Sequence, residues 1–192
     1  MNAQNFHTRM SKSNYYYKSN ASMTMAVRDA LINQCEYLKL ETSTVFADGK
    51  QIINPKLRSS KTVWLYADSW VGGMLAHFVN VANNLHYKYD LTNWETRIQY
   101  TTYETGDHYG WHVDSTEGPE ITRKLSVSLC LSDKTEYEGG ELQIMMGTQM
   151  NTIKMGMGDV IIFPSDCVHR VRKVKSGKRI SLVGWYGGPN FK

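Results

Sequence analysis

The chain has 192 residues and a mass of 22.0 kDa, the size of one ordinary domain, which argues against two full catalytic domains. Its 41% hydrophobic residues, 21% charged residues and mean hydropathy of -0.45 are typical of a globular protein and exclude a disordered or fibrous one. The net charge of +4 is a mild excess, compatible with a nucleic-acid partner or an acidic substrate and diagnostic of neither.

The N-terminal residues 1–20 are polar and contain three consecutive tyrosines, so they form either a loose arm or an edge strand. They lack the apolar segment of a secretory signal, and the longest solid apolar block, 160–163, is far shorter than the roughly 18 residues of a membrane span. The three cysteines are widely spaced, with no CxxC pair. We therefore expect a cytoplasmic protein with reduced thiols.

Two amphipathic helices are predicted in the first half of the chain. The first begins after Ser22, which we expect to be its N-cap, and the second begins after Asp68 or Ser69 and runs to Leu85. In the second helix Gly72-Gly73 indicates close packing against a neighbour. The apolar residues at three- and four-residue steps are Met23, Val27, Ala30, Leu31, Cys35 and Leu38, then Val71, Met74, Leu75, Phe78, Val79, Ala82 and Leu85. The connecting loop from Asp48 to Lys61 has the length of a lid, although the sequence does not show whether it closes over a site.

From Trp94 onward, short β-rich runs alternate with Gly, Pro, Asp and Asn clusters, a pattern typical of a sandwich or jelly roll. We predict an α+β, mainly β fold: a single domain over 21–192, with helical support from 21 to 93 and a jelly-roll (double-stranded β-helix) core from 94 to 192. The expected strands are Ile98–Tyr103, Lys124–Leu131, Glu141–Met145, Thr152–Met155, Val160–Phe163, Val168–Val174 and Arg179–Tyr186.

The strongest chemical signal is the pair His112 and Asp114, followed 55 residues later by His169. Residues two apart on a strand share a face, so His112 and Asp114 would project together. With His169 added, the set is the two-histidine, one-carboxylate triad of non-haem Fe(II) sites. A zinc peptidase pair of His108 and His112 is disfavoured because the glutamate of that motif is missing.

A second signal is Arg179, ten residues beyond His169 at the start of a predicted strand. Its guanidinium, pointing inward, would hold the far carboxylate of a dicarboxylic cosubstrate through two parallel hydrogen bonds. Residues Ser181, Val183 and Trp185 would share its face of the strand. In the strand 125–131 the leucines and Val127 form an apolar face, and the small residues Ser126, Ser128 and Cys130 leave room for a ligand.

Together these residues resemble the Fe(II)- and 2-oxoglutarate-dependent dioxygenases, specifically the prolyl 4-hydroxylase-like branch and its bacterial PKHD-type hydroxylases. Five stretches match in the family's order and cover about half the chain, from Tyr103 onward, and Arg58-Ser59-Ser60 is a weaker match upstream. The five are YGWHVD (109–114), KLSVSLCLSD (124–133), YEGGEL (137–142), GDVIIFPS (158–165), and the stretch from His169 through GKR (177–179) to Trp185.

The resemblance implies that His112, Asp114 and His169 bind Fe(II) and that Arg179 pairs with the C5 carboxylate of 2-oxoglutarate. Tyr103 and Ser126 would be secondary contacts to this cosubstrate, and Trp185 would line the pocket. Some animal relatives have a tyrosine at the position of Cys130, so cosubstrate affinity is expected to differ here. The family's reaction consumes O2 and 2-oxoglutarate, hydroxylates a C–H bond and releases succinate and CO2, with L-ascorbate as the expected reductant.

Resemblance favours a peptidyl prolyl residue, in a peptide or protein, as the substrate, and a free amino acid or another small molecule stays open. Oxidative dealkylation of nucleic acid is a further alternative, encouraged by the basic run 170–179. That branch usually has a second arginine six residues after the first, where this chain has Trp185. The remaining alternative is a non-catalytic jelly-roll binding module. The intact set of three metal ligands and Arg179 argues against it.

Overall fold

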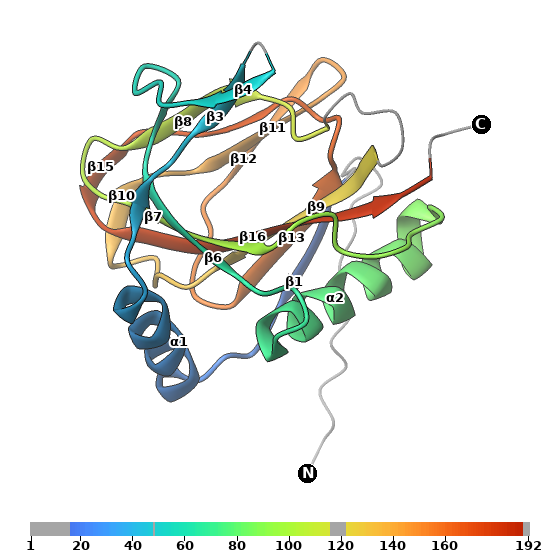
Figure 1. The fold of residues 1–192 in the computed structure, drawn as a ribbon, viewed down its shortest axis with the longest axis horizontal. Helices are drawn as coiled ribbons and strands as arrows, with labels where there is room; N and C mark the ends of the chain where they lie inside the picture. The colour runs from blue at the N-terminus through green and yellow to red at the C-terminus, as the bar shows by residue number, and fades with distance from the viewer. Residues whose placement is uncertain (1–15, 48, 116–121, 190–192) are drawn as a thin grey trace.

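The computed structural model describes residues 16–47, 49–115 and 122–189, and it shows two β-sheets that face each other (Figure 1). In this described part the larger sheet has seven strands, in the order β1 (Tyr17–Asn20), β13 (Asp159–Pro164), β9 (Thr122–Cys130), β16 (Arg179–Gly188), β7 (Ile98–Tyr103), β6 (Lys61–Leu65) and β2 (Glu41–Thr42). The smaller sheet has five, in the order β12 (Gln149–Ile153), β11 (Leu142–Met146), β14 (His169–Val171), β8 (His108–His112) and β5 (Arg58–Ser59). Two further pairs are β10 (Tyr137–Gly139) with β15 (Val174–Gly177), and β3 (Val45–Ala47) with β4 (Lys50–Ile52).

The core has two parts because the larger sheet is covered on both faces. Helices α1 (Met25–Tyr37) and α2 (Trp70–Ala82) lie on its outer face, and the five-stranded sheet lies on the other (Figure 1). Along β9, Leu125, Val127 and Leu129 pack toward the helices. Between the sheets, Cys130 joins a second cluster with Ile144 and Phe163. The predicted mainly β jelly roll with supporting helices is confirmed.

Helix α1 begins later than predicted. Its N-cap is Thr24, whose hydroxyl accepts a hydrogen bond from the amide of Val27, whereas Ser22 has a positive φ of 48° and lies in a bend before the helix. Only Leu31 and Cys35 of its predicted apolar face are fully buried. The spacing of apolar residues therefore identified the buried centre of this helix face correctly. The residues at both ends of the face are partly or fully exposed to solvent.

Helix α2 begins as predicted, with the Ser69 hydroxyl accepting a hydrogen bond from the amide of Gly72. It ends at Ala82 and continues as one π-helical turn, η1 (Asn83–Tyr87), in which Leu85 is 57% exposed. Leu85 is therefore not part of the buried face, because the wider turn rotates it toward solvent.

The stretch 21–93, predicted as helical support, contains strands β2 to β6 as well as both helices. Strands β4 and β5 interrupt the predicted loop from Asp48 to Lys61. Sequence patterns did not reveal these strands because most are two or three residues long, too short for a visible alternation. The three-residue strand β10 was missed for the same reason, and the five-residue strand β8 was not among the expected strands either. The predicted strand Val168–Val174 is divided into β14 and β15, and the predicted strand Thr152–Met155 corresponds to β12.

The N-terminal choice between arm and strand is resolved for Tyr17–Asn20, which pairs antiparallel with β13 as an edge strand. Residues 1–15 lie outside the described residues. No helix in the described ranges is long and apolar enough to cross a membrane.

Candidate active site

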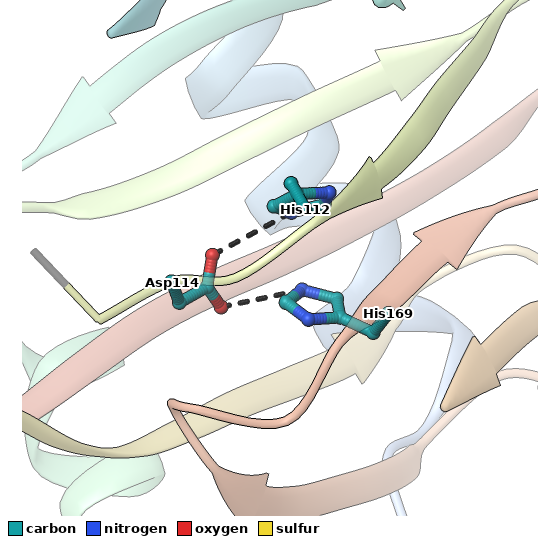
Figure 2. A group of neighbouring side chains, drawn as sticks. All are labelled: His112, Asp114 and His169. Atoms are coloured by element: carbon teal, nitrogen blue, oxygen red, sulfur yellow. Dashed lines mark ion pairs between the residues drawn. The ribbon is translucent and has the colours of Figure 1, made fainter. Parts of the chain in front are cut away.

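Two paired strands and the segment that follows one of them bring the predicted metal ligands together. His112 is the last residue of β8, Asp114 follows two residues later, and His169 is the first residue of β14, where it pairs directly with His112. One ligand atom from each side chain lies within 4.8 Å of the others. Figure 2 shows both imidazoles pointing toward the Asp114 carboxylate. This is the one such metal-ligand cluster among the described residues.

The backbone fixes the tautomer of both imidazoles. His112 Nδ1 lies 2.8 Å from the carbonyl oxygen of Gly110, and His169 Nδ1 lies 2.9 Å from that of Cys167. Because a carbonyl can only accept, each Nδ1 carries a proton and donates it to the carbonyl oxygen. In the neutral ring, the free lone pair is then on Nε2. The two Nε2 atoms lie 3.6 Å and 3.4 Å from the oxygens of Asp114. This arrangement orients metal-binding lone pairs toward one point.

The Asp114 carboxylate is buried and held in place. Its amide donates to the carbonyl oxygen of Ser165, and its Oδ2 accepts a 2.7 Å hydrogen bond from the Ser126 hydroxyl. Burial alone raises the pKa of Asp114, but the interactions with His169 and His112 outweigh burial and hold that pKa well below its usual value. The carboxylate is therefore ionised, as a metal ligand must be.

The two histidines respond differently to the shared carboxylate. Burial lowers the pKa of His112, and the nearby Asp114 only partly offsets that effect. For His169, burial also lowers the pKa, but the charge and hydrogen bond of Asp114 outweigh it, so the net shift is upward. One carboxylate and two imidazoles could together hold a divalent ion from one side, with the carboxylate offsetting part of its charge. The residues fit an Fe(II) site with open positions.

A cavity of about 250 Å³ opens beside the triad, between the two sheets. Its floor on the larger sheet is formed by alternate residues of the paired strands β7 and β16. The register partners are Tyr103 with Arg179, Thr101 with Ser181, and Gln99 with Val183, and Trp185 follows on β16. The predicted inward face of Arg179, Ser181, Val183 and Trp185 is therefore the face that lines the cavity. Ser126 and Ser128 of the predicted small face also line it, whereas Cys130 lies in the apolar core between the sheets.

Arg179 is only 1% exposed and has no carboxylate within ion-pair distance in the described parts of the chain. Its Nη1 donates to the Ser181 hydroxyl over 3.0 Å, its Nη2 lies 3.8 Å from the sulfur of Met155, and its Nε has no partner. The Tyr103 ring lies 5.5 Å from the guanidinium carbon. A buried cation without a counter-ion at a cavity wall favours an anionic ligand in that cavity.

The other predicted cosubstrate contacts all line the cavity but differ in their partners. Tyr103 lies next to Arg179. Ser126 uses its hydroxyl to hold Asp114, which makes it a positioning residue for the metal carboxylate. Trp185 has an indole N–H with no partner, and the guanidinium of Arg123 lies 4.4 Å from its ring.

The structure adds residues that the sequence did not single out. Tyr137 of β10 lies beside Arg179, where both side chains would contact a Cβ at Gly140, and burial raises the pKa of its phenol. A phenol therefore does lie near Arg179, although the chain has Cys130 where some relatives have tyrosine. Tyr109 stacks on the His112 ring at 3.5 Å between centroids. The sequence signals for this side of the cavity were the YGWHVD stretch, which contains Tyr109, the predicted ligand His169, and the weak upstream match at Arg58. His108, at the other end of β8, lies 3.1 Å from the Lys56 carbonyl oxygen and is not part of the cluster, which rules out the helical zinc pair.

Comparison with known proteins agrees with this geometry. Residues 98–187 match the sequence model of the 2OG-Fe(II) oxygenase superfamily. A PKHD-type hydroxylase of Synechococcus sp. (strain CC9902) is 43% identical over 82 residues, which are 43% of this chain and 37% of that relative. A PKHD-type hydroxylase of Idiomarina loihiensis is 34% identical over 100 residues, which are 50% of this chain and 46% of that relative. The chain thus spans less than half the length of these two curated relatives.

Solved structures match over most of the chain. The crystal structure of a Pseudomonas putida prolyl-4-hydroxylase has a TM-score of 0.71 at 17% identity, covering 93% of this chain and 95% of that one. A Trichoplax adhaerens prolyl hydroxylase, solved with a peptide fragment of the hypoxia inducible factor oxygen degradation domain, has a TM-score of 0.74 at 16% identity, covering 91% and 84%. At these identities the likeness establishes the fold alone.

Proposed function

We propose that this protein is an Fe(II)- and 2-oxoglutarate-dependent dioxygenase that hydroxylates a peptidyl prolyl residue. The match of residues 98–187 to the sequence model of the 2OG-Fe(II) oxygenase superfamily supports the dioxygenase class. The observation that carries the proposal is that one cavity is lined by both the His112, Asp114, His169 cluster and the buried, unpaired Arg179. A metal site alone would serve many chemistries. A metal site beside Arg179, a buried cation without an ion pair, favours a cosubstrate that can chelate the metal and also carries a negative charge.

Each residue has a defined role in this proposal. His112, Asp114 and His169 would hold Fe(II) on one side and leave the cavity side open. Arg179, oriented by Ser181, would bind the C5 carboxylate of 2-oxoglutarate and place its oxo-acid end toward the triad. Bound iron would supply the activation of O2 that couples release of succinate and CO2 to hydroxylation of the substrate, with L-ascorbate keeping it reduced.

The protein's own groups create the environment for this chemistry. The lining includes the apolar side chains Val183, Leu142 and Phe163 together with the Trp185 ring, which would help to exclude water from the space between metal and substrate. Ser126 and Ser165 fix the carboxylate of Asp114 through a chain of hydroxyl contacts at 2.7 Å and 2.9 Å. The metal geometry is therefore set before any ligand arrives.

The prolyl substrate is supported by relatives rather than by a contact in this chain. The Pseudomonas putida and Trichoplax adhaerens structures with the same fold are named prolyl hydroxylases, and the second was solved with a peptide. The experiment is a library of proline-containing peptides incubated with the protein, Fe(II), 2-oxoglutarate, ascorbate and air, with peptide masses and succinate measured together. We expect peptides to gain one oxygen atom at proline.

Two variants sharpen this experiment. His112→Ala removes a metal ligand and should abolish both products, while circular dichroism verifies that the variant folds. Arg179→Leu should raise the 2-oxoglutarate requirement at least tenfold, since each charge-assisted hydrogen bond contributes roughly 1.5 to 3 kcal/mol. The matched control is Arg172→Leu, which alters an exposed arginine paired with Glu141. Succinate without peptide oxidation would retain the dioxygenase and reject the prolyl substrate, and full activity of His112→Ala would reject both.

A further inference from the structure

A second buried arginine lines the cavity from the opposite sheet. Arg58 lies on β5 of the five-stranded sheet and is 9% exposed, whereas Arg179 lies on β16 of the seven-stranded sheet. The Nε of Arg58 donates to the Ser60 hydroxyl over 3.0 Å, and its Nη1 donates to the carbonyl oxygen of Thr44 over 3.3 Å. Both acceptors are neutral. Within the described ranges, no carboxylate lies within ion-pair distance of Arg58.

This cation is therefore only partly compensated. The ring of Tyr109 lies 4.6 Å from its guanidinium carbon and provides a cation–π contact. A guanidinium has five N–H donors, and the two hydrogen bonds to Ser60 and Thr44 use only two of them. A buried charge that keeps free donors at a cavity wall favours binding of an anion from that cavity.

The other charged groups of the cavity are already engaged. Arg123 forms an ion pair with Glu95 and donates to the Asp114 carbonyl oxygen over 3.2 Å. Asp114 is the one carboxylate among the described lining residues, and it faces the two metal-binding imidazoles. Arg179 is assigned to the cosubstrate. Arg58 is the remaining cation of this described lining, so a ligand at Arg58 must bring its own negative charge.

The position of Arg58 relates it to the reacting centre. The ring of His112 covers one face of Tyr109 at 3.5 Å with an interplanar angle of 12°, so the guanidinium must lie over the opposite face. Arg58 is thus separated from a metal ligand by the thickness of one aromatic ring. An anion on Arg58 would therefore bind in the cavity that the triad also lines, without replacing a metal ligand.

We propose that Arg58 binds a carboxylate of the primary substrate, so that the hydroxylated molecule is an acid whose carboxylate lies near the oxidised carbon. This inference rests on the proposed function, because it concerns the substrate of the same site. The carboxylate has two possible sources: the terminal carboxylate of a C-terminal proline, or the side chain of an acidic residue beside proline in a peptide. Both present the same group to the guanidinium.

The test measures binding, not hydroxylation, so its failure is distinct from failure of the proposed function. The full-length protein is loaded with Mn(II) and 2-oxoglutarate without O2, and ligands are titrated by calorimetry. The first pair is N-acetyl-L-proline against N-acetyl-L-prolinamide, which differ in the charge of the carboxyl group. The second pair is an amidated, acetylated Glu-Pro peptide against its Gln-Pro counterpart. These two pairs separate the two sources of the carboxylate.

We expect the acid of at least one pair to bind at least tenfold more tightly than its neutral partner. This preference should disappear in Arg58→Gln and persist in part in Arg58→Lys, which keeps the charge but loses the fork of donors. Arg172→Gln is the surface control and should leave the preference unchanged. Mn(II) affinity shows whether each variant retains its metal site, and 2-oxoglutarate affinity is measured separately.

Several outcomes would overturn the inference. These are equal binding of acid and neutral partner in both pairs to the unaltered protein, no binding of any of the four probes, or a preference retained in Arg58→Gln. A loss of 2-oxoglutarate affinity in Arg58→Gln would instead place Arg58 on the cosubstrate. Equal binding of acid and neutral partner by the unaltered protein overturns the inference even where a variant fails to fold.

Discussion

The Ser126 hydroxyl donates to Asp114 Oδ2 over 2.7 Å, joining β9 of the larger sheet to the residues that follow β8 of the smaller sheet. Ser126 also lies 2.9 Å from the Ser165 hydroxyl, so the hydroxyl has a second contact that fixes its rotamer. The metal carboxylate is therefore oriented by the facing sheet as well as by its own backbone.

This relationship predicts that Ser126→Ala weakens metal binding. The carboxylate would lose the partner that orients it, and losses of such partners typically reduce metal affinity by about 10- to 100-fold. Anaerobic titration with Fe(II) or Mn(II) measures the change. Ser128→Ala is the matched control, because Ser128 lies two residues along the same buried face. Equal affinities of the two variants would remove Ser126 from the metal site.

A glycine sets the position of Arg179. Gly140 has a positive φ of 61°, and a Cβ there would lie 3.0 Å from Arg179 Cδ and 3.2 Å from Tyr137 Cε2. We expect Gly140→Ala to displace the guanidinium and raise the 2-oxoglutarate requirement by about tenfold, which corresponds to roughly 1.4 kcal/mol. Steady-state kinetics of succinate release across 2-oxoglutarate concentrations would measure it.

The control for this variant is Gly147→Ala. Gly147 has almost the same φ, 60°, but a Cβ there meets nothing within 4 Å. Both alanines have the backbone cost of a left-handed conformation, about 1 to 2 kcal/mol, and only one disturbs Arg179. A rise in 2-oxoglutarate requirement in both variants would mean that the backbone cost, not the contact, is responsible.

Sequence patterns predicted the parts of the site that depend on spacing and alternation. The triad followed from an H-x-D pair and a later histidine, and Arg179 from its place on an alternating strand. Arg58 and Tyr137 stood in stretches that match the family, Arg58 weakly, but the patterns gave them no role, because β5 has two residues and β10 has three, with an irregular register beside Gly139. A strand that short has no period, and its position is set by the partner strand. The sequence therefore predicted the side of the cavity built on β16 more completely than the opposite side.

Helix boundaries show a similar limit. A Ser and a Thr two residues apart are both good N-caps, and only the backbone conformation distinguishes Ser22 from Thr24. The end of α2 was misplaced because a π-turn keeps apolar residues close to the helical period while rotating the last of them, Leu85, outward. These choices depend on tertiary contacts, which a periodic pattern does not contain.

The Gly72-Gly73 pair allows a test of helix packing within two adjacent positions. A Cβ at Gly72 would lie 1.9 Å from the carbonyl oxygen of Ala67, whereas a Cβ at Gly73 meets nothing within 4 Å. Close packing was predicted for both and is observed only at Gly72. We expect Gly72→Ala to lower the free energy of unfolding by about 1 to 3 kcal/mol, because backbone must move.

Gly73→Ala should instead raise the free energy of unfolding. Alanine is favoured over glycine inside a helix by roughly 1 kcal/mol, and nothing opposes the added methyl group. Urea unfolding monitored by circular dichroism gives both values. Destabilisation by both substitutions would show that α2 has less space on its outer face than the structure indicates.

Tyr87 fastens the N-terminal edge strand to the sheet. Its phenol accepts a hydrogen bond from the Tyr17 amide over 3.1 Å and donates one to the Ile162 carbonyl oxygen over 2.9 Å, and these two residues are register partners of β1 and β13. Burial raises the pKa of Tyr87, so the phenol keeps the proton that it donates.

Tyr87→Phe would leave a backbone donor and a backbone acceptor without this partner, and we expect a loss of about 1 to 3 kcal/mol in the free energy of unfolding. Hydrogen exchange at the Tyr17 amide should accelerate in the same variant, whereas Tyr37→Phe, at a tyrosine that is 93% exposed, should change neither quantity. Unchanged exchange at Tyr17 in Tyr87→Phe would mean that the pairing of β1 with β13 holds the strand without the phenol.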